Sequence, residues 1–281
     1  MSESPRERIE RYYATVPLSF AEAEAWGSFC LFVRTEAGAP YYGGPNHARP
    51  GTTAVTPTAE DIALVRARQR ELGVPETFEW LAEVTPALRG RLVEAGLPVA
   101  ERPLMVLGRQ HRLPRPPVAD GVTIRPVEAD DPALPAVLAL PRLAFADEGT
   151  AVGPAGRAEL DAAAGHLTSD GTVETVRPSL RTGDKTLIAA FAPDGTPLAA
   201  GHYHPSDSTT EIGGIGTLPS ARRRGLGAAV MAALVAHARD RGVGTVFLAY
   251  ADEAVARIYA RLGFRPAGTT LLIANQPARG Q

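Results

Sequence analysis

The sequence predicts a two-domain protein of the mixed α/β class, in which a central mixed sheet is flanked by helices. Three observations support this prediction. At roughly 150 residues per domain, the 281 residues correspond to about 1.9 domains. Strand-like and helix-like segments alternate along most of the chain. The composition, 44% hydrophobic and 21% charged, is that of a globular protein and excludes a mainly disordered or fibrous chain.

A polar, proline-rich segment at residues 108–121 separates the two predicted domains. Proline favours extended backbone and interrupts helices, so this segment is typical of a linker. We therefore expect a first domain at residues 1–108, a linker at 109–120 and a second domain at 121–281.

The first domain has the weaker signals for individual elements. Strands are expected at residues 29–35, 52–56, 78–81 and 104–107, helices at 59–72 and 86–94, and a turn after 41–45. Thr58 is the expected N-cap of the first of these helices, because its hydroxyl can accept a hydrogen bond from the first turn.

The second domain has clearer apolar patterns, in the order β-α-α-β-β-β-α-β-α-β. Strands are expected at residues 122–127, 186–192, 198–203, 210–218, 245–250 and 264–273, the last as one or two strands. Helices are expected after the acidic pair Asp130-Asp131 to about residue 146, and at 153–166, 225–241 and 253–262. Polar residues 165–184 are predicted to be a surface loop, Asp194-Gly195 a hairpin turn, and Gly242 a helix C-cap.

The two halves share an order of elements: strand, helix, strand, helix ending in glycine, strand. Aligned on Gly96 and Gly263, residues 77–97 match residues 245–264. The pattern indicates an internal repeat. The alternative is that unrelated α/β segments share this order by chance.

The strongest chemical signal is a basic, glycine-containing turn between a strand and an amphipathic helix, at residues 215–238. Glycine lets the backbone approach a bulky anion, and the first amides of a helix point toward it. The turn lacks the Gly-Lys-Ser/Thr of a nucleotide-triphosphate loop and the third glycine of a dinucleotide fold. The alternative is a basic surface turn that only caps the helix.

Arg222, Gly225 and Gly227 fit the spacing Arg/Gln-x-x-Gly-x-Gly/Ala, and here the chain resembles the GNAT superfamily of acyl-CoA-dependent N-acyltransferases. The resemblance implies that Thr217 and Leu218 pair with the pantetheine arm of coenzyme A. It also implies that the pyrophosphate is bound at Arg222, Arg223, Arg224, Gly225, Leu226, Gly227 and Ala228, chiefly through backbone amides. The resemblance is strong over residues 186–273, moderate from 121 and weak before 108, where it implies a degenerate copy without a site.

A second motif, ARIYARLGF, places Tyr259 four residues before Gly263-Phe264. In the resembled family this tyrosine lies near the thioester sulfur, so the resemblance implies that Tyr259 is a general acid for the leaving thiolate. A thiol has a pKa of about 8.5 and a phenol one of about 10, so a phenol placed beside the sulfur can donate as thiolate charge develops. The alternative is a packing tyrosine. Asp252 stands where many relatives have an asparagine that contacts the pantetheine, so this cofactor contact departs from the family's pattern.

An amine acceptor must lose a proton before it attacks, and Glu211, eleven residues before Arg222, is the first candidate base. Some relatives have their glutamate base at this offset. His202 and His204, which share one face of a strand, are the alternatives, and Asp207 could contribute. Each of these residues could instead be structural. No third ligand suggests a metal, so none is expected.

We therefore expect an N-acetyltransferase that uses acetyl-CoA, or another short acyl-CoA, on an amine that is more plausibly a small molecule than a protein. The alternatives are a catalytically inactive acyl-CoA-binding sensor or partner module, and the same fold acting with a larger acyl group or a hydroxyl acceptor. Direct attack is expected, because Cys30, the only cysteine, lies in an apolar run typical of a buried residue.

The remaining expectations follow from composition. A net charge of -2 indicates no nucleic acid or membrane partner. No apolar run approaches 18 residues, and the charged N-terminus lacks the apolar core of a signal peptide, which predicts a cytoplasmic location. Lys185 is the only lysine among 29 basic Lys and Arg residues, a bias typical of a GC-rich bacterial genome. A monomer and a homodimer are both compatible with the sequence.

Overall fold

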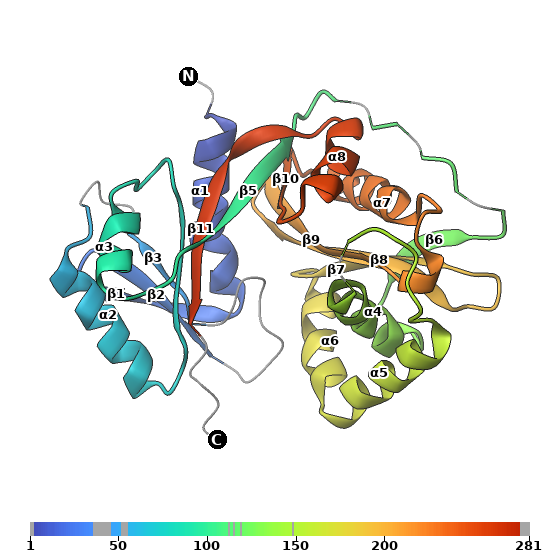
Figure 1. The fold of residues 1–281 in the computed structure, drawn as a ribbon, viewed down its shortest axis with the longest axis horizontal. Coiled ribbons are helices and arrows are strands. Elements are labelled where there is room, and N and C mark those ends of the chain that lie inside the picture. The colour runs from blue at the N-terminus through green and yellow to red at the C-terminus, as the bar shows by residue number, and fades with distance from the viewer. Residues whose placement is uncertain are drawn as a thin grey trace. The chain divides into compact units, whose positions relative to one another are not determined.

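The computed structural model describes residues 3–275, apart from 36–45, 52–55, 112, 115, 119 and 148. The chain forms two compact units (Figure 1), the first made of Met1–Leu104 with Pro266–Gln281 and the second of Met105–Arg265. The turn predicted after residues 41–45 lies outside the described residues, as does most of the strand predicted at 52–56. No helix in the described part of the chain is long and apolar enough to cross a membrane.

These units differ from the predicted domains at both boundaries. The last strand, although it lies at the C-terminal end of the chain, belongs to the first unit. It pairs antiparallel with another strand of that unit, from Thr270 opposite Leu81 to Asn275 opposite Glu76. The predicted linker belongs to the second unit, where the Arg239 guanidinium donates to the carbonyl oxygens of Gly108 (2.9 Å) and His111 (2.7 Å).

The first unit contains strands in the order β1-β2-β3-β4-β11, and strand β5 carries the chain across the boundary. Its elements are α1 (Pro5–Thr15), β1 (Ala21–Trp26), β2 (Phe29–Arg34), β3 (Ala48–Pro50), α2 (Ala59–Glu71), β4 (Glu76–Leu81), α3 (Leu88–Glu94), β5 (Ala100–Leu107) and β11 (Arg265–Asn275). Helix α1 and strands β1 and β3 were not predicted. The core packs Phe29, Phe78 and Trp80 against apolar residues of α2 and α3.

The second unit contains strands in the order β10-β9-β8-β7-β6, parallel between β10 and β9 and antiparallel otherwise. Its elements are β6 (Thr123–Val127), α4 (Leu134–Ala146), α5 (Arg157–Ser169), α6 (Thr172–Thr182), β7 (Thr186–Phe191), β8 (Pro197–Ser206), β9 (Thr209–Thr217), α7 (Leu226–Asp240), β10 (Thr245–Ala249) and α8 (Glu253–Arg261). The mixed α/β class is confirmed, as are the predicted hairpin and the left-handed Gly242 after α7.

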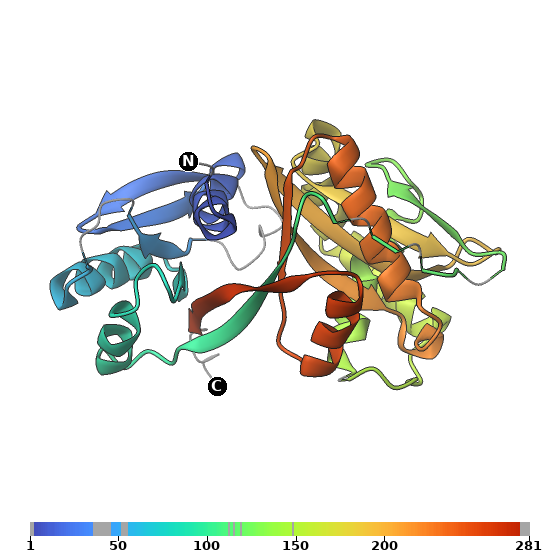
Figure 2. The same cartoon turned by 90° about the horizontal axis from the view of Figure 1, so that it is seen from above.

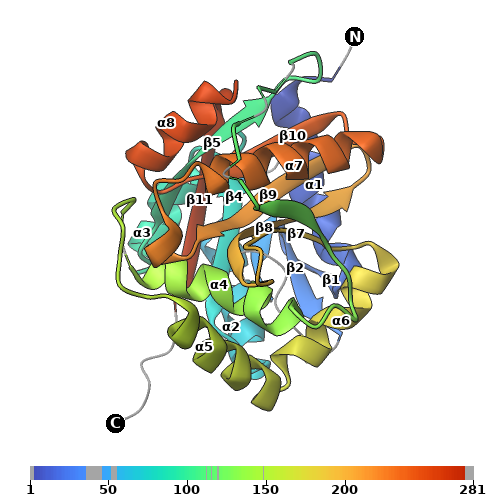
Figure 3. The same cartoon turned by 90° about the vertical axis from the view of Figure 1, so that its right-hand side faces the viewer.

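Helices cover both faces of this second sheet. Helix α7 lies on one face, as Figure 2 shows, and α4, α5 and α6 lie on the other (Figure 3). The glycines of the central strands allow the close contact: a side chain at Gly201 would meet Leu234 of α7, and one at Gly216 would meet Ala144 of α4. The central strands are therefore enclosed between helices on both faces.

The predicted surface loop at residues 165–184 is wrong, because it contains the end of α5 and the whole of α6. Val173, Val176 and Leu180 recur at helical spacing and are buried. The helix begins after the left-handed Gly171. The Gly, Ser and Thr residues of this segment, and a proline inside the helix, obscured that spacing in the sequence.

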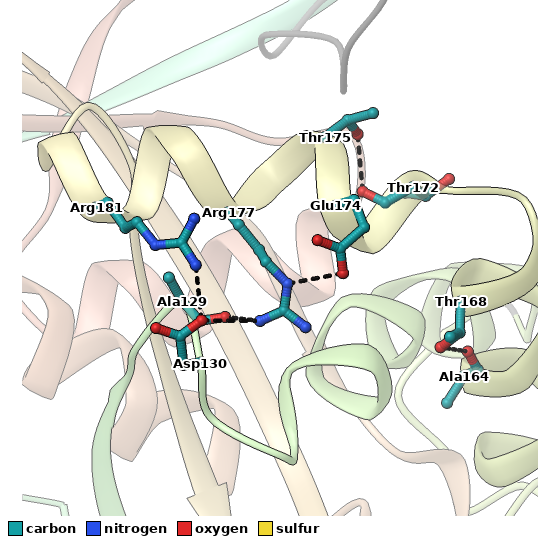
Figure 4. Close-up of polar contacts among 9 residues, drawn as sticks. All are labelled: Ala129, Asp130, Ala164, Thr168, Thr172, Glu174, Thr175, Arg177 and Arg181. Carbon is teal, nitrogen blue, oxygen red and sulfur yellow. Dashed lines mark hydrogen bonds and ion pairs between the residues drawn. The ribbon is translucent and has the colours of Figure 1, made fainter.

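Polar contacts fix α6 to the segment before α4 (Figure 4). Arg181 donates to the Asp130 carboxylate at 2.7 Å, and Arg177 donates to the carbonyl oxygen of Ala129 while contacting Glu174 at 2.9 Å. Asp130, one of the acidic pair that was predicted only to precede a helix, therefore also anchors a second helix.

The internal repeat has a counterpart in backbone hydrogen bonds. After α3, the amide of Leu97 donates to the carbonyl of Leu92; after α8, the amide of Phe264 donates to that of Tyr259. The glycines that precede these donors, Gly96 and Gly263, both have positive φ. Both helices thus end in the same glycine motif, with Leu92 at the position of Tyr259.

The ends of α2 and α7 match as well. The amide of Val74 donates to the carbonyl of Gln69, and the amide of Val243 donates to that of Ala238, each directly after a positive-φ glycine. The same pattern is visible in the sequence: each Gly-Val pair is followed, four residues after the valine, by a phenylalanine, Phe78 in one case and Phe247 in the other. The alignment on Gly96 and Gly263 did not include this pattern.

A buried carboxylate gives the first unit a pH-dependent stability. Burial raises the pKa of Glu79 to about 7, against the opposing effect of nearby Arg49 and Arg102. Because the folded state holds this proton more tightly than the unfolded chain, stability is highest in acid and is lost as pH rises from the unfolded pKa of 4.5 through 7. The total loss is about 3 kcal/mol.

We expect Glu79→Gln to remove this dependence. In urea titrations, the variant's free energy of unfolding relative to the natural protein should rise by about 2.5 kcal/mol between pH 5 and pH 8. The exposed Glu94 supplies the control, since Glu94→Gln should follow the natural protein at both pH values. Parallel curves for Glu79→Gln and the natural protein would contradict the assignment.

Candidate active site

The basic turn joins the end of β9 to the start of α7 and has the backbone conformation of an anion site. Arg223 and Gly225 both have positive φ, 66° and 73°. Gly225 is the N-cap of α7, and this helix begins without a side-chain cap. The first amides of a helix have no acceptor within the helix, so these amides are available to a ligand.

The turn is close to the strand that precedes it. A side chain at Gly227 would lie 3.3 Å from the Thr217 hydroxyl. The side chains of Arg223 and Arg224 are exposed beside Gly225. The structure therefore brings together the predicted segments 217–218 and 223–228 around one positively charged, amide-rich surface.

Arg222, also predicted to bind the cofactor, points elsewhere. Its side chain is buried, and its guanidinium donates to the carbonyl oxygens of Ala144 (2.7 Å), Asp147 (2.7 Å) and Ala151 (3.1 Å). These carbonyls lie at the end of α4 and in the segment that follows it. The Arg222 side chain thus binds the backbone of this segment, whereas the next residues of the turn, Arg223 to Gly225, are exposed to solvent.

Strands β9 and β10 pair along a short stretch and then separate. Their ladder runs from Thr209 opposite Thr245 to Glu211 opposite Phe247, although β9 continues to Thr217. Beyond Glu211, the edge of β9 next to β10 has backbone groups outside this ladder. An extended ligand can pair with such an edge as an added strand. Glu211 lies at the point where the two strands separate.

Glu211 is buried within a row of titratable side chains. The strand register places it opposite His204, and the rings of His204 and His202 lie 5.4 Å apart, edge to face. His204 Nδ1 donates to the carbonyl oxygen of Asp184 at 3.0 Å, which assigns the ring proton to that nitrogen. Glu211 and the two histidines, predicted as alternative bases, therefore form one cluster.

Lys185 completes this row and was not predicted to belong to it. Burial lowers the pKa of Lys185 to about 8. Burial and the charge of Lys185 hold the pKa of His202 and of His204 well below the ordinary value, so both rings are neutral at pH 7. The one feature of the sequence that could have drawn attention to Lys185 is that it is the only lysine of the chain.

A bulge shapes the strand beside His202. The pairing of β8 with β9 shifts register between Ala200 and His202, and Gly214 has φ of 62°. A side chain at Gly214 would lie 2.6 Å from the His202 ring. Glycine is thus required there both by its backbone and by the imidazole.

Tyr259 lies on α8, within the glycine motif that ends this helix. Its side chain is 8% exposed, and its ring centroid is 6.1 Å from that of Phe264. Burial raises the pKa of Tyr259 to about 12, so the phenol keeps its proton at neutral pH. It can donate a hydrogen bond, but full transfer of its proton to a thiolate is unfavourable.

Two other predicted residues have local roles. Asp252 is the N-cap of α8, and its carboxylate accepts from the amide of Ala254 at 2.7 Å. Asp207 is an exposed residue with φ of 49° at the tip of the β8–β9 hairpin.

Cys30, expected to be buried, is only partly buried on β2 of the first unit, and this partial burial raises the pKa of its thiol.

The fold is an α/β domain in which strands β9 and β10 separate beside a basic turn, and comparisons give its family. Residues 158–264 match the model of the Acetyltransferase (GNAT) family. These residues form a GNAT domain, and the resemblance predicted from the sequence is confirmed.

Solved structures resemble nearly the whole chain. A GCN5-related N-acetyltransferase from Kribbella flavida has a TM-score of 0.70 and 22% identity, over 96% of this chain and 95% of that one. A tandem GNAT protein from the clavulanic acid biosynthesis pathway has a TM-score of 0.55 and 15% identity, over 93% and 87%. A GCN5-related N-acetyltransferase from Sphaerobacter thermophilus has a TM-score of 0.52 and 17% identity, over 89% and 81%. No curated protein sequence matches the chain.

Proposed function

We propose that this protein transfers the acetyl group of acetyl-CoA, or another short acyl group, to the amine of a small molecule. The observation that carries this proposal is the uncapped start of α7 directly after a strand whose edge separates from its neighbour. A ligand with a pyrophosphate and an extended amide-containing arm complements both features at once.

The corresponding turn of the first unit supports a single site. At the start of α2, the Asp61 carboxylate accepts from the amide of Thr58 (2.8 Å), and the Thr58 hydroxyl accepts from the amide of Asp61 (3.2 Å). A carboxylate thus occupies the position where α7 offers free amides, and it would repel a phosphate. We infer a tandem arrangement in which the first unit is a diverged copy that binds no coenzyme A.

The proposed reaction is direct attack of a neutral amine on the thioester. The amine nitrogen forms a bond to the carbonyl carbon and loses its second proton to solvent as the amide forms. The carbon–sulfur bond breaks, and sulfur leaves with the electron pair. Tyr259 donates a hydrogen bond to the developing thiolate, whose proton finally comes from solvent because the phenol is the weaker acid.

The ammonium proton of the acceptor goes to the buried cluster. Glu211 is the proposed base because it lies where β9 and β10 separate. His202 is the alternative base, since its ring is neutral and partly exposed. His204 lies beside both residues, and its Nδ1 proton is used in the hydrogen bond to the carbonyl of Asp184. A carboxylate next to neutral rings can accept a proton without opposing positive charge from them.

Calorimetry with acetyl-CoA, together with a thiol-release assay over a panel of amines, tests the proposal. We expect one acetyl-CoA bound per chain and amine-dependent release of coenzyme A. Binding without turnover of any amine would favour the alternative, an acyl-CoA sensor or partner module. A stoichiometry of two would contradict the diverged first copy, and an absence of binding would contradict the whole assignment.

A further inference from the structure

Arg222 joins the proposed coenzyme turn to the segment between α4 and α5, residues 147–156. Its guanidinium contacts the last turn of α4 at Ala144, the start of this segment at Asp147 and its middle at Ala151. The Asp147 carboxylate also lies 3.5 Å from Nη1 of the same guanidinium. One buried side chain therefore holds three separate backbone carbonyls.

Backbone hydrogen bonds strengthen this connection from the other side. The amide of Gly153 donates to the carbonyl of Pro219 at 3.1 Å, and the amide of Ser220 donates to that of Ala155 at 3.0 Å. A side chain at Gly153 would overlap the Asp147 carboxylate and touch Pro219. The α4–α5 segment and the turn are thus packed as one body.

This body borders the place where the acyl arm would lie. The end of α4 packs directly on Gly216 of β9, where a side chain would lie 2.9 Å from the Ala144 side chain. Arg222 itself immediately precedes the amides that would bind the pyrophosphate. A ligand that fixes those amides therefore also restricts Arg222 and the segment it holds.

We propose that Arg222 is a positioning residue that couples coenzyme binding to the ordering of the segment at residues 147–156. The inference rests on the proposed function. Coupling between two such elements is reciprocal: a segment ordered by the coenzyme must in turn strengthen coenzyme binding. Arg222 acts through backbone carbonyls and does not touch the reacting atoms.

Hydrogen exchange of the full-length protein, with and without saturating coenzyme A, tests the coupling. In the natural protein, coenzyme A should slow amide exchange in residues 147–156 by about tenfold, besides slowing the turn and the start of α7. In Arg222→Gln and Arg222→Lys, neither side chain can span three carbonyls. The turn should still be slowed by coenzyme A, while the 147–156 segment exchanges fast in both states.

Arg142→Gln is the matched control, because it removes the same charge from an exposed position on α4 and leaves the carbonyl contacts of Arg222 intact. It should keep the slowed segment at saturating coenzyme A. Equal slowing of residues 147–156 in the Arg222 variants would overturn the coupling, as would a natural protein whose segment does not respond. If coenzyme A does not bind the natural protein, the proposed function fails as well. Should Arg222→Gln not fold, Arg222→Lys decides.

Discussion

Gly225→Glu is expected to abolish coenzyme binding. Gly225 has φ of 73° at the N-cap of α7, and its open surroundings leave room for a side chain, since the nearest atom to a Cβ would be 3.6 Å away. A glutamate there would bring its carboxylate over the amides, as Asp61 does at α2. Like-charge repulsion of about 3 kcal/mol raises the Kd of acetyl-CoA by about 100-fold or more.

Two variants at the same position separate charge from backbone strain. Gly225→Asn tolerates left-handed backbone and adds no charge, so its Kd should stay within about tenfold of the natural value. Gly225→Ala adds strain alone and should fall between the two. Calorimetry measures all three, with thermal unfolding as the check that each is folded. Unchanged affinity in Gly225→Glu would remove the turn from the coenzyme site.

Tyr259→Phe is expected to lower kcat by about 100-fold, with acetyl-CoA affinity nearly unchanged. The substitution removes only the phenol oxygen and keeps the ring that packs near Phe264. The loss falls on kcat because the hydrogen bond to sulfur strengthens as negative charge develops in the transition state. Burial at this site makes that hydrogen bond stronger than it would be in water.

Tyr250→Phe is the matched control, since it removes a phenol oxygen from a partly exposed tyrosine that follows β10 in the same unit. Steady-state kinetics with an amine identified from the panel give kcat and KM, and calorimetry gives the affinity for acetyl-CoA. Full turnover in Tyr259→Phe would exclude this phenol from the mechanism. A shared loss in both variants would point to a general effect of the substitutions on folding.

Much of the second unit was predictable because its signals are local. The turn at residues 222–228 combines positive charge, two glycines and the start of an amphipathic helix within a few positions. Short apolar runs bounded by turn residues likewise located β7, β8, β9 and β10. By contrast, helix α6 was missed although Val173, Val176 and Leu180 mark its buried face, because Pro178 and its polar neighbours resemble a loop.

The sequence by itself determined the mixed α/β class, most of the order of elements and the basic, glycine-containing turn, since each depends on periodicity and backbone conformation over a few residues. Only the tertiary structure decided that β11 pairs with β4, that Arg222 holds the carbonyls after α4, and that Lys185 joins His204 and Glu211. These partners lie tens of residues apart in the chain. No local pattern records which of several competent strands or acceptors will be adjacent once the core has packed.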